Sequence, residues 1–294
     1  MRKSPRRKET DMGRSSILGV FILLWGTCVI WLPANAATGA PASPLACRLT
    51  SYGKFEDAAW THLPSIGVHY VFLSVPAPDQ VEYTMKRLKQ HGLTPLVMRG
   101  NTDLSKESCV EELAVQLATC QRMGVEYMFL SPKRNGADKA VVFDRLRKAG
   151  DIAKQHGVII TLETHPDLGT NGDVHVETMK AINHPNVRVN FDTGNITFYN
   201  KGADAIAELR KVIDYVATVE LKDHSGEFET WSFPPLGQGV VQFPAILQVL
   251  KEHRFAGPVT IEFEGVKGVE LDKEQTKKAI ADSVAYIKSV GQFK

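Results

Sequence analysis

Short apolar runs alternate with helical patterns along residues 45–290 of this chain. Eight runs have strand character, and each is followed by a segment in which apolar residues recur at helical spacing. Val81, Met85 and Leu88, at positions i, i+4 and i+7, form one such helical face. The predicted strands cover residues 46–52, 69–75, 94–98, 127–131, 158–163, 187–192, 217–222 and 259–263.

Eight strand-helix units within roughly 250 residues predict an α/β protein with a single (β/α)8 TIM barrel over residues 45–294. The alternative is an open, doubly wound sheet, which usually has a glycine-rich turn after its first strand. Here that position reads Tyr52-Gly53-Lys54-Phe55 and holds no G-x-G-x-x-G motif. The pattern therefore favours the barrel.

The N-terminal 36 residues have the layout of a secretory signal peptide. Residues 16–32 contain no charge, a basic stretch precedes them, and Ala34-Asn35-Ala36 fits a cleavage site. We therefore expect a signal peptide over 1–36, a small-residue linker over 37–44, and export to the periplasm or the extracellular space. The alternative is that residues 16–32 stay in place as a membrane anchor, although this run is slightly shorter than the ~20 residues that a spanning helix prefers.

Composition and charge exclude several classes of protein. The chain is 43% hydrophobic and 23% charged, as globular proteins are. Its net charge of +2 comes from the N-terminal segment, since residues 37–294 hold 29 Lys and Arg against 31 Asp and Glu. This balance argues against a nucleic-acid partner. Four cysteines are too few for a disulfide scaffold, and Cys109 and Cys120 lie about 16 Å apart along one predicted helix.

Ionisable residues end four consecutive predicted strands, although buried parallel strands are normally apolar. Because alternate residues on a strand face the same side, these polar residues should converge inside the barrel at its C-terminal mouth. The residues that share this inward parity are Thr161, Glu163, His165, Asn190, Asp192, Glu220, Lys222, His224, Thr260, Glu262 and Glu264.

Carboxylates that converge in a partly dry cavity repel one another, so a compensating charge is expected. A divalent cation with oxygen ligands is one solution. The alternative is a set of ordinary ion pairs with Lys222, Arg188 or surface cations. Matched parity at four strand ends favours the cation.

At these residues the chain resembles the xylose isomerase-like TIM barrel superfamily, the sugar phosphate isomerase/epimerase family. The resemblance covers residues 45–290 and is carried by the segments LETHPDLGTNG (162–172), NFDTGN (190–195), ELKDH (220–224), PLGQG (235–239) and GPVTIEFEG (257–265). It implies one divalent metal ion (Mn, Mg or Co) held at the four strand ends by Glu163, Asp192, Glu220 and Glu262. Glu220 departs from the pattern, because the family usually has His there.

The resemblance also implies roles in proton transfer and substrate binding. Glu163 and Glu262 would act as the acid/base pair for a proton next to a carbonyl, through an enediolate. His165 and Lys222 are candidates for contacts with substrate oxygens, and His224 is a further candidate at the site. Asn195 would either bind substrate or cap the next helix.

The expected function is that of a metal-dependent sugar isomerase or epimerase with a small-molecule sugar substrate. A lyase or dehydratase acting on oxidised sugars would use the same chemistry. A sugar-binding barrel with a degenerate metal site is a further alternative, supported by Glu220. A nuclease of the AP-endonuclease type is less consistent with the sequence, because it needs a His-rich zinc cluster and a basic groove. No stable membrane partner is expected if the signal segment is removed, and a homo-oligomer is possible.

Overall fold

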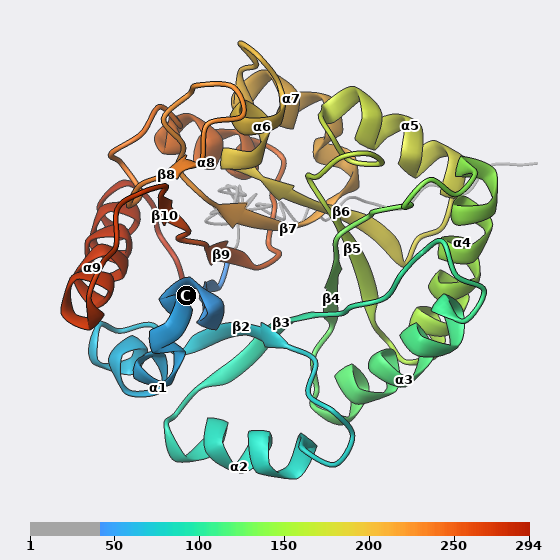
Figure 1. Cartoon of the computed structure of the whole chain (residues 1–294), viewed down its shortest axis with the longest axis horizontal. Coiled ribbons are helices and arrows are strands. Elements are labelled where there is room, and N and C mark those ends of the chain that lie inside the picture. Colours follow the sequence, from blue (N-terminus) through green and yellow to red (C-terminus); the bar gives the residue numbers. More distant parts are fainter. Residues whose placement is uncertain (1–41) are drawn as a thin grey trace, which may run out of the picture. The chain divides into compact units, whose positions relative to one another are not determined.

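The structure is a computed structural model that describes residues 42–294. Eight parallel strands close into a barrel in the order β1-β2-β3-β4-β5-β6-β7-β9 (Figure 1). This confirms the predicted (β/α)8 architecture. The strands are β1 (Leu45–Arg48), β2 (Tyr70–Ser74), β3 (Thr94–Arg99), β4 (Tyr127–Leu130), β5 (Ile159–Glu163), β6 (Val187–Asp192), β7 (Val216–Leu221) and β9 (Val259–Ile261).

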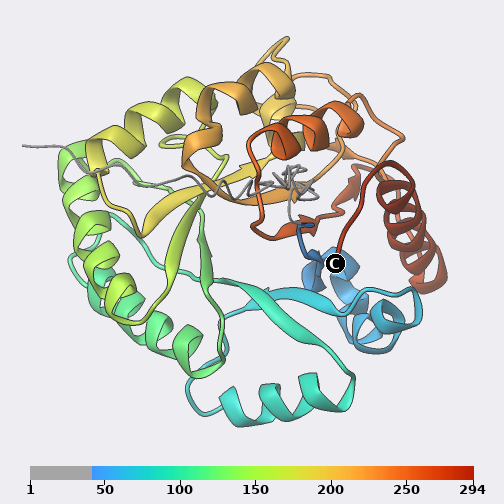
Figure 2. The same ribbon diagram turned by 180° about the vertical axis from the view of Figure 1, so that it is seen from behind.

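Helices surround the barrel on its outside, as Figures 1 and 2 show from the two ends. Among the described residues, none of them is long and apolar enough to cross a membrane. The predicted signal peptide over 1–36 lies outside the described residues. The helices are α1 (Glu56–Ser65), α2 (Val81–Gln90), α3 (Cys109–Arg122), α4 (Lys139–Gln155), α5 (Gly172–Ile182), α6 (Thr193–Tyr199), α7 (Ala205–Val212), α8 (Phe243–Glu252) and α9 (Lys273–Val290).

The main core lies between the strands and the helices. Val189, Phe191 and Val219 are fully buried there, on the outward faces of β6 and β7. The inward faces carry polar residues instead, as the two-residue period predicts. A second, small apolar cluster fills the barrel interior at Phe72, Val97 and Phe129.

The first strand is shorter than the sequence pattern predicts. It ends at Arg48, and residues Leu49–Phe55 form a 3-10 helix that is kinked at Gly53. Within this segment the Ser51 hydroxyl accepts a hydrogen bond of 3.0 Å from the Phe263 backbone N–H. The segment therefore crosses to the end of β9 and contributes residues to the barrel mouth.

A two-stranded antiparallel sheet lies next to the mouth, where the sequence pattern predicts only a loop. It pairs β8 (Ser232–Phe233) with β10 (Gly265–Val266). The long loop between β7 and α8 is also fixed by Asp223, whose carboxylate accepts hydrogen bonds from the backbone N–H groups of Gly237 (2.8 Å), Gly239 (2.8 Å) and Val241 (3.2 Å). Gly239 has no room for a side chain, since a Cβ there would overlap the Asp223 carboxylate.

Candidate active site

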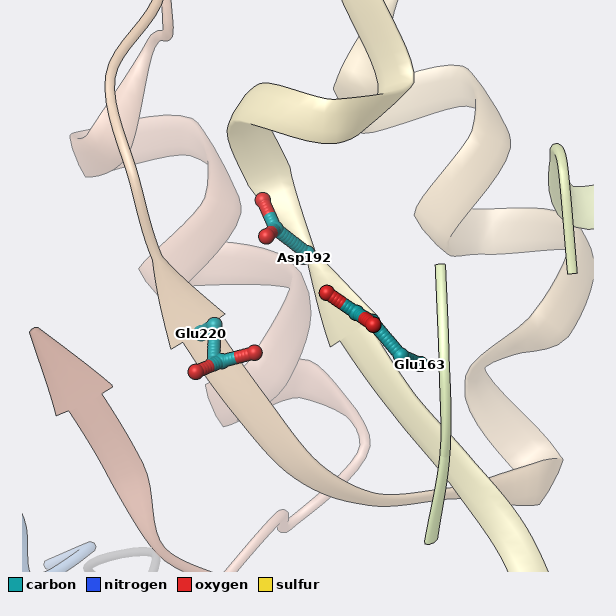
Figure 3. A group of neighbouring side chains, drawn as sticks. All are labelled: Glu163, Asp192 and Glu220. Atoms are coloured by element: carbon teal, nitrogen blue, oxygen red, sulfur yellow. The ribbon is translucent and has the colours of Figure 1, made fainter. Parts of the chain in front are cut away.

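Three buried carboxylates meet inside the barrel at the ends of consecutive strands. Glu163, Asp192 and Glu220 each offer an oxygen atom within 4.8 Å of the others (Figure 3). The strand register explains the meeting, because Glu163 lies beside Asn190 and Asp192 lies beside Glu220. The structure thus brings together three of the four predicted metal ligands.

Asp192 has a second, structural role at the start of α6. Its Oδ1 accepts hydrogen bonds of 2.9 Å from the backbone N–H groups of Gly194 and Asn195. Asp192 is therefore the N-cap of α6, a role that the sequence pattern offers to Asn195. The other oxygen, Oδ2, lies on the side of Glu163 and Glu220. It accepts no hydrogen bond from any described residue.

Arg48 is a buried cation that sequence reasoning missed. Its guanidinium lies 3.1 Å from Glu220 Oε1 and forms a closer ion pair with Glu262. It also packs against two aromatic rings, with Cζ 4.4 Å from the centroid of Phe72 and 4.9 Å from that of Phe129. The parity rule that selected the acids applies here too, because Arg48 ends a buried, otherwise apolar strand.

Lys222 is the second buried cation. Its Nζ lies 3.2 Å from Glu262 and 3.7 Å from Asp192, and it contacts Glu264 more closely. It also donates a hydrogen bond of 3.1 Å to Asn195 Oδ1. Burial alone lowers the pKa of Lys222, but the surrounding carboxylates outweigh this and raise it. Lys222 is therefore protonated at neutral pH, although it lies in the interior.

The donor set fits a divalent cation. Glu163, Asp192, Glu220 and Glu262 carry a formal charge of −4, and Arg48 and Lys222 offset only part of it because Lys222 also pairs with Glu264. A divalent ion would reduce the negative charge that remains. Three buried oxygens of these four acids accept no hydrogen bond from any described residue: Asp192 Oδ2, Glu220 Oε1 and Glu262 Oε2. Carboxylate oxygens are ligands that hard divalent ions prefer.

Burial also changes the pKa values of two of these carboxylates, Asp192 and Glu220. Burial raises the pKa of Asp192 to about 6 and that of Glu220 to about 7, although Lys222 and Arg48, respectively, oppose the rise. Both residues thus hold protons more readily than free carboxyls do when no cation is bound. A cation would have to displace those protons.

A cavity of about 370 Å³ opens at the carboxyl ends of the strands, a size that suits a small molecule. Glu163 and Glu262 line it, whereas Asp192 and Glu220 are fully buried and do not. Trp231 and Phe233, from β8 and the loop before it, contribute an aromatic side. Two of the four acids can thus touch a ligand.

The remaining predicted site residues divide between the cavity and the scaffold. His165 and Asn195 both line the cavity. His165 packs against Tyr199, with ring centroids 5.0 Å apart, and Asn195 donates a hydrogen bond of 3.0 Å to the Thr164 carbonyl. His224 does not line the cavity: Thr197 is 2.9 Å from its Nδ1 and the Thr230 carbonyl is 2.9 Å from its Nε2. The structure therefore gives His224 a supporting position.

Ser131 is another cavity residue that the sequence did not single out. It follows β4, and its hydroxyl donates a hydrogen bond to Glu163 Oε2. This bond and the Asn195 amide, 3.5 Å from Oε1, orient the Glu163 carboxylate from two sides. A serine at a strand end carries no distinctive pattern, so the sequence could not select it.

Comparisons with known proteins agree with this fold. An inosose isomerase from Bacillus velezensis is 24% identical over 230 residues, which cover 72% of this chain and 80% of that protein. The D-psicose 3-epimerase structure from Clostridium cellulolyticum H10 matches with a TM-score of 0.68 at 14% identity, over 84% of this chain and 99% of that one. A probable 3-DHS dehydratase from Bacillus anthracis matches with a TM-score of 0.63 at 16% identity, over 83% and 98%.

These structural similarities show a shared fold, and a family model describes the same region of the sequence. The model of the xylose isomerase-like TIM barrel matches residues 61–290, which include all the strand-end acids. The closed barrel, the buried carboxylates at its C-terminal mouth and this match lead to one conclusion: the chain belongs to the xylose isomerase-like TIM barrel family.

Proposed function

We propose that this protein is a divalent-metal-dependent isomerase or epimerase of a sugar or sugar derivative. The observation that carries the proposal is that the four acids differ in their access to the cavity. Glu163 and Glu262 reach the cavity, while Asp192 and Glu220 are buried behind the lining. Two carboxylates that can touch a substrate, beside a group that can hold a cation, suit proton transfer next to a carbonyl.

Glu163, Asp192 and Glu220 would hold the ion, and Glu262 is a fourth candidate ligand. When bound, a divalent ion polarises substrate oxygens and stabilises negative charge that develops on them. The all-carboxylate ligands favour magnesium or manganese over softer metals.

Glu163 and Glu262 come from β5 and from the end of β9, and each has its own supporting contacts. Ser131 and Asn195 orient Glu163, and Arg48 and Lys222 hold Glu262. One carboxylate removes the proton from the carbon next to the carbonyl, and the other group, in its carboxylic acid form, gives a proton to form the product. His165 and Asn195 lie in the cavity, where they can bind substrate hydroxyl groups.

Dehydration is the second candidate, and Lys222 favours it. Its ammonium group lines the cavity next to Glu262 and Glu264. After the same proton abstraction, an ammonium group at this position could give a proton to a departing hydroxyl group. A panel of substrates would separate the two reactions, because only dehydration releases water and leaves a double bond.

The test is proton exchange by the full-length protein with manganese, followed by NMR of keto- and aldo-sugars in deuterium oxide. Glu262→Gln should keep the fold, as judged by circular dichroism. It should reduce exchange by about 10²- to 10⁴-fold, the usual contribution of a general acid or base. The matched control is Glu227→Gln, at an exposed loop position that does not line the cavity. Exchange at the wild-type rate in Glu262→Gln would rule out the assigned acid/base pair.

A further inference from the structure

The cavity is divided by charge. Its carboxylates all come from β5 or from residues just after β9. The lining residues from β1 to β4 and the loops that follow them include three cations and no acid: Arg48, Arg99 and Lys133. One side of the mouth is therefore acidic and the other is basic.

Two of the cations that line the cavity are left without an acidic partner. Arg48 pairs with Glu220 and Glu262, and Lys222 is surrounded by carboxylates. Arg99 and Lys133, in contrast, have no carboxylate oxygen within 4.0 Å among residues 42–294, and their side chains form no hydrogen bond there. Their charges are available to a ligand.

The strand register directs Arg99 into the mouth. Val97, two residues earlier on β3, packs inside the barrel with Phe72 and Phe129. Because side chains alternate along a strand, Arg99 has the same inward parity one layer closer to the opening. Arg99 also lies beside Phe129 of β4 in the sheet register, close to where the Lys133 loop begins.

Hydrogen bonds hold the two loops that carry these cations. After Arg99, the Asn101 backbone exchanges two bonds of 2.8 Å with the side-chain amide of Gln116 on α3. Asn135, beyond Lys133, donates a bond of 2.9 Å to Asp103 and so ties the two loops together. A ligand would not need to order these loops, which lowers the cost of binding.

A second cavity of about 440 Å³ adjoins the first, and Arg99, Ser131 and Lys133 line both. That second cavity also holds two acids, Asp103 and Glu112, which accept hydrogen bonds from Ser105, Asn135, Thr102 and Ser108. The two free cations therefore stand where the two cavities meet.

We propose that the substrate is an anion, with a carboxylate or phosphate group bound between Arg99 and Lys133 while its carbonyl end faces Glu163 and Glu262. The planar guanidinium can donate two parallel hydrogen bonds to either group, and the ammonium adds a second positive charge. This inference deepens the proposed function and rests on it, because it assigns the substrate class to the same mouth. Sugar acids, keto acids and phosphorylated sugars share the required chemistry.

The test compares three ligands that have the same ring and differ only at carbon 6: D-glucose, D-glucuronate and D-glucose 6-phosphate. Binding to the full-length protein is measured by calorimetry at low ionic strength. At least one acid should bind about 10- to 100-fold more tightly than glucose, as charged hydrogen bonds predict. The tighter acid identifies the group as carboxylate or phosphate. In Arg99→Gln/Lys133→Gln this preference should disappear.

The control is Lys86→Gln/Lys89→Gln, which removes two charges from the exposed face of α2 and should keep the preference. Equal or absent binding of all three ligands, or a preference that survives in the Arg99/Lys133 variant, overturns the inference. Proton exchange on neutral sugars with no acid preference would refute only the anion site. Arg99-dependent binding of acids without metal-dependent exchange on any sugar would refute only the proposed function.

Discussion

At the scale of single residues, the site depends on how buried charges are paired. Sequence parity selected Glu163, Asp192 and Glu220 because acids are conspicuous at the ends of apolar strands. Arg48 obeys the same rule on β1, but the sequence pattern predicts a strand over 46–52 and so places Arg48 within the strand and not at its end. Its contacts explain how a glutamate can occupy position 220, because the positive guanidinium lies next to the Glu220 carboxylate and offsets its negative charge.

Arg48→Met should destabilise the metal-free protein strongly. Glu220 and Glu262 would lose a buried partner, which costs about 3–5 kcal/mol and lowers the melting temperature by about 6–20 °C in a chain of this size. Added manganese should then restore more stability to the variant than to the wild type. Arg87→Met is the matched control, because Arg87 also pairs with an acid, Asp57, and lies over an aromatic ring, Trp60, but at the surface. A thermal scan in which both variants melt alike would contradict this account of Arg48.

At the scale of elements, strand order and helix faces were predictable, whereas the loops were not. Periodicity identifies buried strands such as β6 and amphipathic helices such as α2, because each pattern repeats locally. The 3-10 segment after β1 and the β8–β10 sheet depend on contacts between residues far apart in sequence. One such contact joins Ser51 to Phe263, and no local pattern reports it.

Asp223 is the residue whose loss should most destabilise the loop between β7 and α8. Asp223→Ala would leave the backbone N–H groups of Gly237, Gly239 and Val241 without their acceptor. A loss of about 2–4 kcal/mol in the free energy of unfolding is expected, because unsatisfied buried donors are costly. Denaturant titration measures this, with Asp79→Ala, at an exposed position, as the control. Equal midpoints for the two variants would show that the loop does not depend on Asp223.

At the scale of the whole molecule, the barrel concentrates negative charge that a cation must offset. Asp192 and Glu220 have pKa values raised by burial, so the folded, metal-free chain binds more protons than the unfolded chain between about pH 4 and 7. Their contribution to stability is therefore greatest below the unfolded pKa and declines as the pH rises through the folded pKa values.

The metal-free protein should lose stability on the order of 3 kcal/mol from these two groups between pH 5 and pH 8. Manganese should compensate at pH 8, because both carboxylates are then free to bind it, and should have little effect at pH 5. Melting temperatures with and without the ion, at the two pH values, measure this. In Glu220→Gln, the stability of the metal-free protein should change less between pH 5 and pH 8. A larger stabilisation by manganese at pH 5 than at pH 8 would contradict the assignment of these ligands.

The central claim is that the strand-end carboxylates hold one divalent ion, and metal content tests it most directly. Full-length protein is incubated with manganese, freed of excess ion and analysed by mass spectrometry beside Asp192→Asn. This variant keeps an oxygen to cap α6 while it removes the charge. Asp79→Asn serves as the exposed control. The account predicts about one ion per chain in the wild type and the control, and a marked loss in Asp192→Asn. No bound manganese in the wild type, or equal amounts in all three proteins, would contradict it.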